Sequence, residues 1–361
     1  MAAERNYAID FIKFFAILIV VSVHTGFLKG FYITDLFDLH FVINTFSRFS
    51  VPFFFVISGF LIAQKSRKYA QTSQYFRKYL WKTLKLFLSW GLFYFCYDLI
   101  IRILYSVLKD ESDKLTNYLD TFVSLKTLYY GPPATAHQLW YLTALIWSVV
   151  ILFIFAKFGK LNLLLVISFV LNLIGIFGQS YSVLLTVPIE TRDALFYGLF
   201  YTTLGYYMAT HYDWIKSKLM HVNPLVYLAL FVVFSLTQLA ERAILIQLFG
   251  QGLGENYYFS TIPLIICLIL FVLSSQNLGK NSFITKIGST TVGIYVLHTF
   301  YISLVVNSLD LFGFSYLLQN IFFQLIYTPS VFILSYISYR GLKLTKHKLK
   351  SYQKETVSPS L

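Results

Sequence analysis

Charged residues are scarce in this sequence: Asp, Glu, Lys and Arg together make up 12% of its 361 residues. In soluble domains about a quarter of the residues are charged, because these side chains cover the surface that faces water. Here hydrophobic residues make up 57% of the chain and aromatic residues 19%. The shortage of charge therefore excludes a soluble domain of this length and predicts an all-α, polytopic membrane protein.

Cysteine is also rare: the two cysteines, Cys96 and Cys267, both lie inside apolar runs. Their number and placement argue against a disulfide framework and a metal cluster, so we expect no bound metal. The net charge is +13. The basic residues lie in short segments between apolar runs, where positive charge faces cytoplasm and anionic lipid heads. We therefore expect membrane lipid, and no nucleic acid, as a partner.

Apolar runs that cross a ~30 Å hydrocarbon core need about 20 residues each, and the sequence predicts a transmembrane bundle of about ten such helices. The predicted spans are 8–28, 41–63, 84–106, 139–157, 161–178, 194–210, 222–240, 257–274, 291–312 and 316–339. We expect a single integral membrane domain over residues 1–343 and a basic, polar and disordered cytoplasmic tail over residues 344–361. Asp10 and Lys13 near the start of the first run favour a retained helix over a cleaved signal peptide.

The distribution of Lys and Arg predicts that both chain ends are cytoplasmic, since inner loops carry the excess of positive charge. The richest inner segment follows the second span and carries Lys65, Arg67, Lys68, Arg77, Lys78, Lys82 and Lys85. The outer segments carry Lys29, Lys109, Lys114, Lys126, Arg192 and Arg242. The longest outer segment, 107–138, contains several aromatic residues and either covers a site or lies in the membrane interface.

Ionisable side chains within or beside the predicted spans mark candidate functional positions. A charge inside a bilayer must pair, line a cavity or take part in chemistry. These residues are Asp10, Lys13, His24, Arg48, Asp98, Arg102, His137, Glu190, Arg192, Asp193 and His298.

Lys13 and His24 are eleven residues apart. At ~100° per residue this spacing places both on one face of a helix, about 16 Å apart along its axis. Such a polar stripe suits a long substrate with an anionic end inside and a reacting end outside. Alternatively, Lys13 pairs with Asp10 and His24 caps the helix end, and spacing alone leaves both interpretations open. On the second span, Ser58 and Gly59 form a small surface that favours close helix packing.

Four segments stand in order along the chain. The first is 5–24 (RNYAIDFIKFFAILIVVSVH) and the second is 47–60 (SRFSVPFFFVISGF). The third is 137–142 (HQLWYL) and the fourth is 293–298 (GIYVLH). Together they resemble the motifs of the acyltransferase-3 family of integral membrane acyltransferases, and the resemblance covers nearly the whole chain.

The sequence departs from this family's pattern in three places. Lys13 stands where the family usually has an arginine ahead of the histidine; lysine keeps the charge but lacks the bidentate fork. His298 is followed by Thr299 rather than by the commoner proline. The family's paired arginines are replaced by a basic group, Arg77, Lys78, Lys82 and Lys85.

The resemblance implies transfer of an acyl group, often acetyl, from cytoplasmic acyl-CoA to a hydroxyl group. The acceptor would be a carbohydrate or lipid-linked carbohydrate of the cell envelope, and the enzyme would lie in a bacterial cell membrane. His24 would be the general base, and Arg48 would stabilise the oxyanion. His137 or Glu190 would orient His24 or bind the acceptor. The residues assigned to the acetyl-CoA side are Lys13, Arg77, Lys78, Lys82, Lys85 and His298.

Other interpretations fit the same features. The basic group equally fits an ordinary inner loop, His298 an ordinary buried histidine, and His137 a helix end. A transporter or flippase for a saccharide would also use about ten helices and a polar stripe, although we find no repeated pair of broken helices in the sequence. A non-catalytic partner in an envelope assembly complex is a third possibility. Transfer of label from acetyl-CoA would distinguish an enzyme from both.

Overall fold

The computed structural model describes residues 5–35, 37–66, 72–109, 113–122 and 124–357, and within these ranges it consists of helices and loops without strands. The α-helices of the first half are α1 (Tyr7–His24), α2 (Leu39–Phe46), α3 (Ser50–Ser66), α4 (Thr72–Lys109), α5 (Asp113–Phe122), α6 (Leu125–Tyr130), α7 (Trp140–Lys157) and α8 (Leu161–Phe177). Those of the second half are α9 (Leu199–Thr210), α10 (Tyr212–Lys218), α11 (Pro224–Phe249), α12 (Thr261–Ser274), α13 (Phe283–Gly288), α14 (Thr291–Leu311) and α15 (Ile321–Val357). Short helical turns of other types are η1 (Ser47–Phe49), η2 (Ala134–Leu139), η3 (Ala194–Gly198) and η4 (Ser315–Gln319).

Each of the ten predicted spans coincides with one of these helices or with two in succession. Among the described residues, seven helical stretches are long and apolar enough to cross a membrane: α1, α2 with α3, α4, η2 with α7, α11, α14 and α15. The predicted class, a multi-pass all-helical membrane protein, is therefore confirmed. Its count of about ten spans and the cytoplasmic side of its ends stay predictions.

The three remaining predicted spans are short helices. α8 has 17 residues, α9 has 12 after the π-helical turn η3, and α12 has 14. At 1.5 Å per residue α12 is about 21 Å long, well short of a ~30 Å hydrocarbon core. Most side chains of α9 and α12 are buried, so these two helices form the interior of the bundle.

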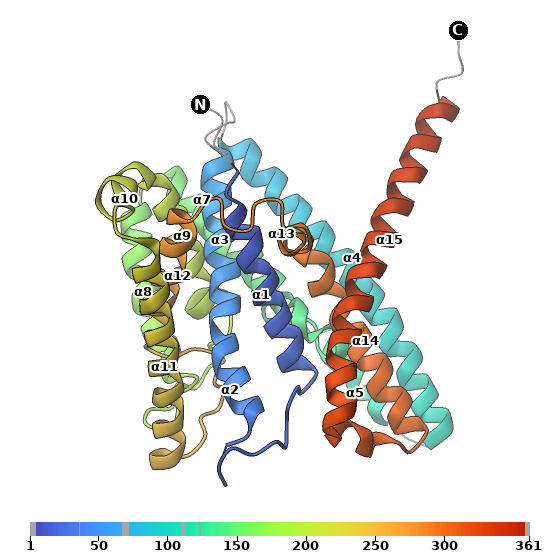
Figure 1. Ribbon diagram of the computed structural model, residues 1–361. Coiled ribbons are helices and arrows are strands. Elements are labelled where there is room, and N and C mark those ends of the chain that lie inside the picture. The colour runs from blue at the N-terminus through green and yellow to red at the C-terminus, as the bar shows by residue number, and fades with distance from the viewer. Residues whose placement is uncertain (1–4, 36, 67–71, 110–112, 123, 358–361) are drawn as a thin grey trace.

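Helix α1 lies between two groups of helices (Figure 1). On one side are α3 and the helices from α7 to α12, and on the other are α4, α5, α14 and α15. α1 begins, and α15 ends, at the same end of the bundle. His24, the last residue of α1, therefore lies toward the opposite end.

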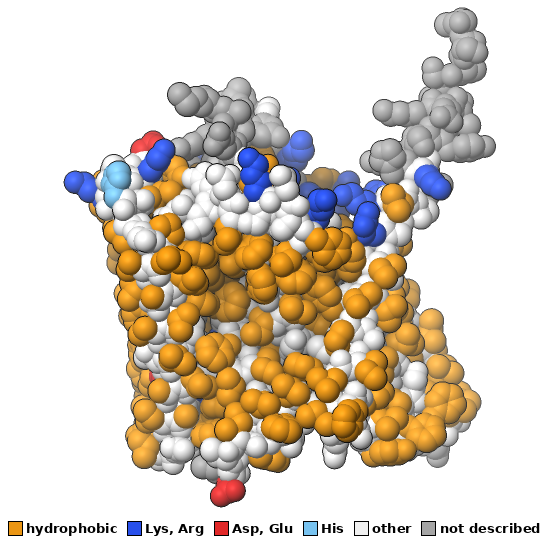
Figure 2. All heavy atoms as spheres, in the orientation of Figure 1, with side chains coloured by type: hydrophobic (Ala, Val, Ile, Leu, Met, Phe, Trp, Pro, Cys, Tyr) orange, Lys and Arg blue, Asp and Glu red, His pale blue; other side chains and the backbone are white. Residues whose placement is uncertain are grey.

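The surface has the character of a lipid-facing protein. Hydrophobic side chains cover the middle of the face in Figure 2, while Lys and Arg side chains gather at the end where α1 begins. Leu92 on α4 is 65% exposed and Val166 on α8 is 61% exposed. In water such exposure would be costly, whereas in a bilayer it places apolar groups against acyl chains.

Glycine allows α3 and α9 to pack with their backbones in contact. A Cβ atom on Gly59 would lie 1.9 Å from the Thr202 carbonyl oxygen, and one on Gly205 would lie 1.9 Å from that of Val56. The small surface predicted at Ser58 and Gly59 is thus confirmed as a close helix contact. α9 is held in the middle of the bundle by this contact.

Two predictions about individual segments are wrong. The tail is not disordered up to residue 357, because α15 continues as a helix to Val357; residues 342–357 contain good helix formers and neither Gly nor Pro. Residues 358–361 lie outside the described residues. Arg242 is not in an outer loop, because α11 extends to Phe249 and buries it. The segment 107–138, which was predicted to lie outside, is partly helical and contains α5, α6 and η2.

We predict that Gly59→Ala destabilises the protein, because the added methyl group must push the backbones of α3 and α9 apart. Overpacking of this kind costs about 1–3 kcal/mol. Gly91→Ala is the matched control, since nothing lies within 4 Å of a Cβ at Gly91 in the interior of α4. Thermal unfolding in detergent should show a lower midpoint for Gly59→Ala alone. Equal midpoints for the two variants would contradict the predicted close contact.

Candidate functional site

A cavity of about 1000 Å³ opens in the half of the bundle that contains His24. Its walls come from the end of α1, the turn η1, the second half of α4, the turn η2 and the second half of α14. This volume is at the upper end of the range for small-molecule sites, so the cavity has room for more than one reacting group.

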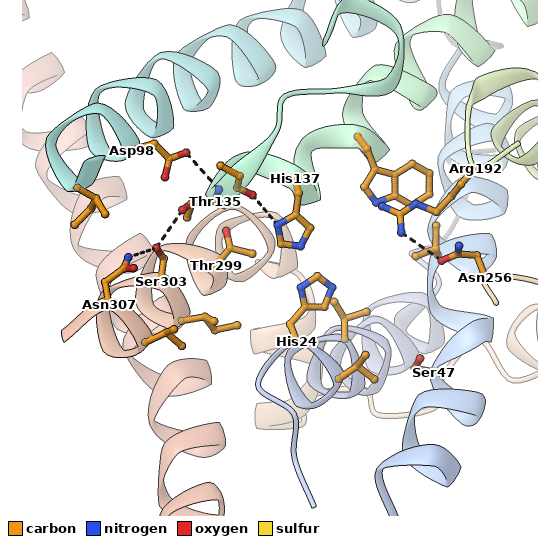
Figure 3. A pocket seen from close by; sticks show the side chains of 18 of the residues that line it. His24, Ser47, Asp98, Thr135, His137, Arg192, Asn256, Thr299, Ser303 and Asn307 are labelled. Carbon is orange, nitrogen blue, oxygen red and sulfur yellow. Dashed lines mark hydrogen bonds between the residues drawn. The ribbon is translucent and has the colours of Figure 1, made fainter. Parts of the chain in front are cut away.

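Three histidines meet at this cavity. The rings of His24 and His137 are stacked, with centroids 5.3 Å apart and an angle of 9° between their planes. The ring of His298 meets His24 edge to face, with centroids 5.1 Å apart. Figure 3 shows His24 and His137 opposite each other in the middle of the cavity. The first, third and fourth sequence motifs therefore meet at one point.

Hydrogen bonds determine which nitrogens of two of these rings carry the proton. The Nδ1 atom of His137 donates to the Ala134 carbonyl at 3.0 Å, and that of His298 donates to the Tyr295 carbonyl at 2.8 Å. Because a carbonyl can only accept, the proton is on Nδ1 and the Nε2 lone pair is an acceptor. Within the described structure, Nε2 of His298 is buried without a hydrogen-bond partner. Both rings thus keep an acceptor nitrogen available beside His24.

Arg48 enters the cavity from η1, the turn that joins α2 to α3. One terminal nitrogen of its guanidinium donates to the side-chain oxygen of Asn44. Its Nε atom is buried and has no hydrogen-bond partner among the described residues. The guanidinium therefore has a fixed anchor and unused hydrogen-bonding capacity, which suits a group that binds negative charge.

Asn44, which anchors Arg48, is itself in contact with the buried ion pair of Arg242 and Glu255. Arg242 on α11 donates from Nε to Glu255 at 2.8 Å, and its Nη1 atom donates to Thr45 at 2.8 Å and to Asn44 at 3.4 Å. Arg242 and Glu255 are each only 8% exposed. Glu255 therefore holds Arg242, and Arg242 holds the residue that anchors Arg48.

A second arginine reaches the cavity from the loop before η3. Arg192 donates to the side-chain oxygen of Asn256 at 3.4 Å, and its guanidinium lies 4.6 Å from the centroid of the Trp140 ring. Figure 3 shows Arg192 and Asn256 at one side of the two histidines. Burial lowers the pKa of Arg192, and the charge of Glu190 acts in the opposite direction. Asn256 thus anchors Arg192 directly, and its neighbour Glu255 holds Arg48 indirectly, through Arg242 and Asn44.

The loop that carries Arg192 is fixed by the next residue. Asp193 caps η3 by accepting from the Phe196 N–H at 2.8 Å, and it accepts from the Tyr129 hydroxyl at 2.9 Å. Burial raises the pKa of Asp193, and these two hydrogen bonds act against that rise. Through Tyr129 the segment 107–138 packs onto the wall of the site, and through His137 it enters the cavity.

The structure brings together most of the residues predicted for the chemistry. His24, Arg48 and His137 line the cavity, and His298 contacts His24. Glu190 is the exception: its side chain is exposed and does not line the cavity. Arg192, two residues later, lies where Glu190 was expected, because the chain turns inward between Glu190 and the cap at Asp193.

Of the residues predicted for the acetyl-CoA side, His298 lies beside His24, whereas the other five lie elsewhere. Lys13 pairs with Asp10 at 3.4 Å, as the alternative interpretation of the stripe proposed, and Asp10 also pairs with Arg5 at 2.8 Å. Lys13 is about 16 Å from His24 along α1. The basic group is exposed on the first turns of α4, well away from the cavity: Arg77, Lys78, Lys82 and Lys85.

Sequence reasoning missed a polar face of α14. Thr299, Ser303, Asn307 and Asp310 all line the cavity and follow one another at steps of four, four and three residues. Such spacing places them on one side of a helix. The pattern could therefore have been recognised in the sequence of the predicted span 291–312. Among the described residues, no group of three His, Cys, Asp or Glu side chains has an arrangement that could hold a metal ion.

Comparison with known proteins gives one match over almost the whole chain: a family model described as an acyltransferase domain matches residues 6–340. Two curated relatives from Enterococcus faecalis are each named as an amino-acid racemase. One is 24% identical over 318 residues, which are 84% of this chain and 42% of the relative. The other is 24% identical over 288 residues, which are 76% of this chain and 37% of the relative. The chain thus spans about two fifths of the length of these relatives. No solved structure matches the chain.

Breaking the Arg242–Glu255 pair should be more harmful than removing it. Arg242→Met leaves the Glu255 carboxylate buried without its partner, which we expect to cost about 3–5 kcal/mol. The double variant Arg242→Met/Glu255→Met should recover most of that loss, since apolar replacement of a whole buried pair is often close to neutral. Thermal unfolding in detergent measures the stability of the single and the double variant. A double variant that is less stable than either single one would show that the pair stabilises the fold directly.

Proposed function

The chain belongs to the acyltransferase-3 family, and on that premise we propose that it transfers an acyl group from cytoplasmic acyl-CoA to a hydroxyl group of a cell-envelope carbohydrate. Family membership and the seven spans make it a multi-pass membrane acyltransferase. The donor, the acceptor and the bacterial cell membrane as its location are parts of the proposal. Racemisation is not carried over from the relatives, because the matched part is less than half of each.

One observation carries the proposal: the three-histidine contact opens into a cavity that is also lined by Arg48 and Arg192. Acyl transfer needs a base for the acceptor hydroxyl and positive groups for the oxyanion, and both are present within one cavity. Transport of a saccharide without chemistry would need neither.

The reaction follows from these roles. The acceptor oxygen forms a bond to the thioester carbonyl carbon while His24 takes the proton from the hydroxyl. Negative charge develops on the carbonyl oxygen, and Arg48 stabilises it, with Arg192 as the second cation of the cavity. The carbon–sulfur bond then breaks, and the CoA sulfur leaves with the proton held by His24. His137, stacked on the His24 ring, and His298, edge to face with it, would hold that ring in the orientation that the proton transfer requires.

Acetyl-CoA is the proposed donor, and the basic group on α4 is its proposed entry point. The support for this is charge and exposure: these four side chains are exposed on the first turns of α4, which begins at the same end of the bundle as α1 (Figure 1). Nucleotide phosphates are multiply charged and bind such groups. The pantetheine arm would then extend along α1 past Lys13 and bring the thioester to His24.

His24→Ala should lower the transfer of label from acetyl-CoA to a carbohydrate acceptor by roughly 10³-fold or more, since a general base contributes about 10²–10⁴-fold and this ring is also the meeting point of the cluster. His211→Ala is the control, because His211 is an exposed histidine at the junction of α9 and α10. Purified protein in detergent and a thermal unfolding scan would separate lost chemistry from lost folding. Near-normal transfer by folded His24→Ala protein would refute the mechanism.

Arg48→Lys should lower kcat by about 100-fold and leave the KM for acetyl-CoA nearly unchanged, because an ammonium cannot reproduce the anchored guanidinium at the oxyanion. Arg340→Lys, at an exposed position on α15, is the control. Steady-state kinetics at saturating acceptor measure both constants. If instead the KM for acetyl-CoA rises and kcat stays the same, Arg48 binds the donor and is not part of the oxyanion site.

A further inference from the structure

One side of the cavity has a set of polar side chains that the acyl-transfer steps do not use. We call this set the polar wall; it comprises Asp98, Arg102, Thr135, Ser303, Asn307 and Asp310, all of which line the cavity. Figure 3 shows four of its members on the side of His24 and His137 opposite to Arg192. The two histidines therefore lie between the polar wall and one of the arginines.

The polar wall begins at the histidines and leads away from them along two helices. On α14 it continues from His298 to Asp310, a rise of about 18 Å at 1.5 Å per residue. On η2, Thr135 is two residues before His137. A molecule lying against this wall therefore has one end beside His24.

Hydrogen bonds join the wall into one surface. The Ser303 hydroxyl contacts the Thr135 hydroxyl at 3.1 Å and accepts from the Asn307 side-chain amide at 2.9 Å. The backbone N–H of Thr135 donates to Asp98 at 3.3 Å. Carboxylate, amide and hydroxyl groups thus alternate along the wall, which is the mixture of acceptors and donors that a row of ligand hydroxyl groups requires.

Both carboxylates of the wall have a cation nearby, although the cation beside Asp310, Lys109, lies outside the wall. Asp310 accepts from Lys109 at 2.7 Å, and Arg102 lies one turn along α4 from Asp98 and interacts with its charge. Each carboxylate therefore has its own cation. A charged ligand would lose its hydration here without finding an uncompensated partner, whereas a neutral ligand would not meet that cost.

We infer that the polar wall is the acceptor subsite and that it selects a neutral, polyhydroxylated ring over a charged one. This inference rests on the proposed function, because it places the hydroxyl that is acylated beside His24. The pairing of charges, rather than the presence of any one residue, is what sets the preference.

Ring-matched probes test the inference by direct binding, without any chemistry. Glucose is neutral, glucosamine carries an ammonium and glucuronate carries a carboxylate on closely related rings. Calorimetric titration of the purified full-length protein should show glucose binding at least about tenfold more tightly than either charged probe, since an uncompensated buried charge costs more than 1.4 kcal/mol. Preference for a charged probe, or binding of none of the three, would overturn the inference.

Two charge variants should change the preference in opposite directions. Asp98→Asn leaves Arg102 without its carboxylate, so the affinity for glucuronate should rise relative to glucose. Arg102→Gln leaves Asp98 without its cation, so the affinity for glucosamine should rise instead. A misfolded or merely loosened protein would lose all three probes together, and that uniform loss would also overturn the inference. Leu304→Ala is the control, because Leu304 follows Ser303 but is 41% exposed on the outer side of α14.

The binding readout separates this inference from the proposed function. If wild-type protein binds glucose but releases no CoA from acetyl-CoA in a His24-dependent way, the proposed function fails and the subsite stands. If CoA release depends on His24 and the acceptor but the two charge variants bind all probes alike, the proposed function stands and the subsite fails.

Discussion

A polar or charged side chain within an apolar bundle is stable where it has a partner or opens into a polar cavity. This constraint determines where each such group lies in the protein. Arg242 is buried against Glu255, Lys13 is paired with Asp10, and His24, Arg48, Asp98 and Arg102 line one cavity. The rest of the interior is left to apolar packing, in which the backbones of α3 and α9 touch at Gly59 and Gly205.

The same constraint divides the cavity into two regions of different character. On one side the arginines keep unused hydrogen-bonding capacity, as the free Nε of Arg48 shows. On the other side carboxylates and cations are matched pair by pair. In the mechanism that we propose, the first region would stabilise the developing anion, and the second would bind a neutral acceptor. The histidines lie between the two regions.

Much of this arrangement was predictable from sequence. The four motifs each contribute one residue to the site, namely His24, Arg48, His137 and His298, and these residues do meet at the cavity. Hydropathy located a helix at each of the ten predicted spans but could not distinguish a lipid-facing span from a short interior helix such as α12, because both are apolar. Glu190 was chosen over Arg192 because nothing in the local sequence shows that the chain turns inward between them. The roles of Glu255 and Asn256 depend on contacts with α11 and the loop before η3, and no local pattern encodes such contacts.

The adjacency of Glu255 and Asn256 has a consequence for how the site tolerates change. Asn256 holds Arg192 directly, and Glu255 holds Arg48 through Arg242 and Asn44, so the positions of these two arginines depend on one dipeptide. An insertion or deletion in the connection between α11 and α12 would disturb both anchors at once. Connecting segments usually vary freely in length, but this connection also positions two charged groups of the cavity, so we expect a change in its length to affect the site.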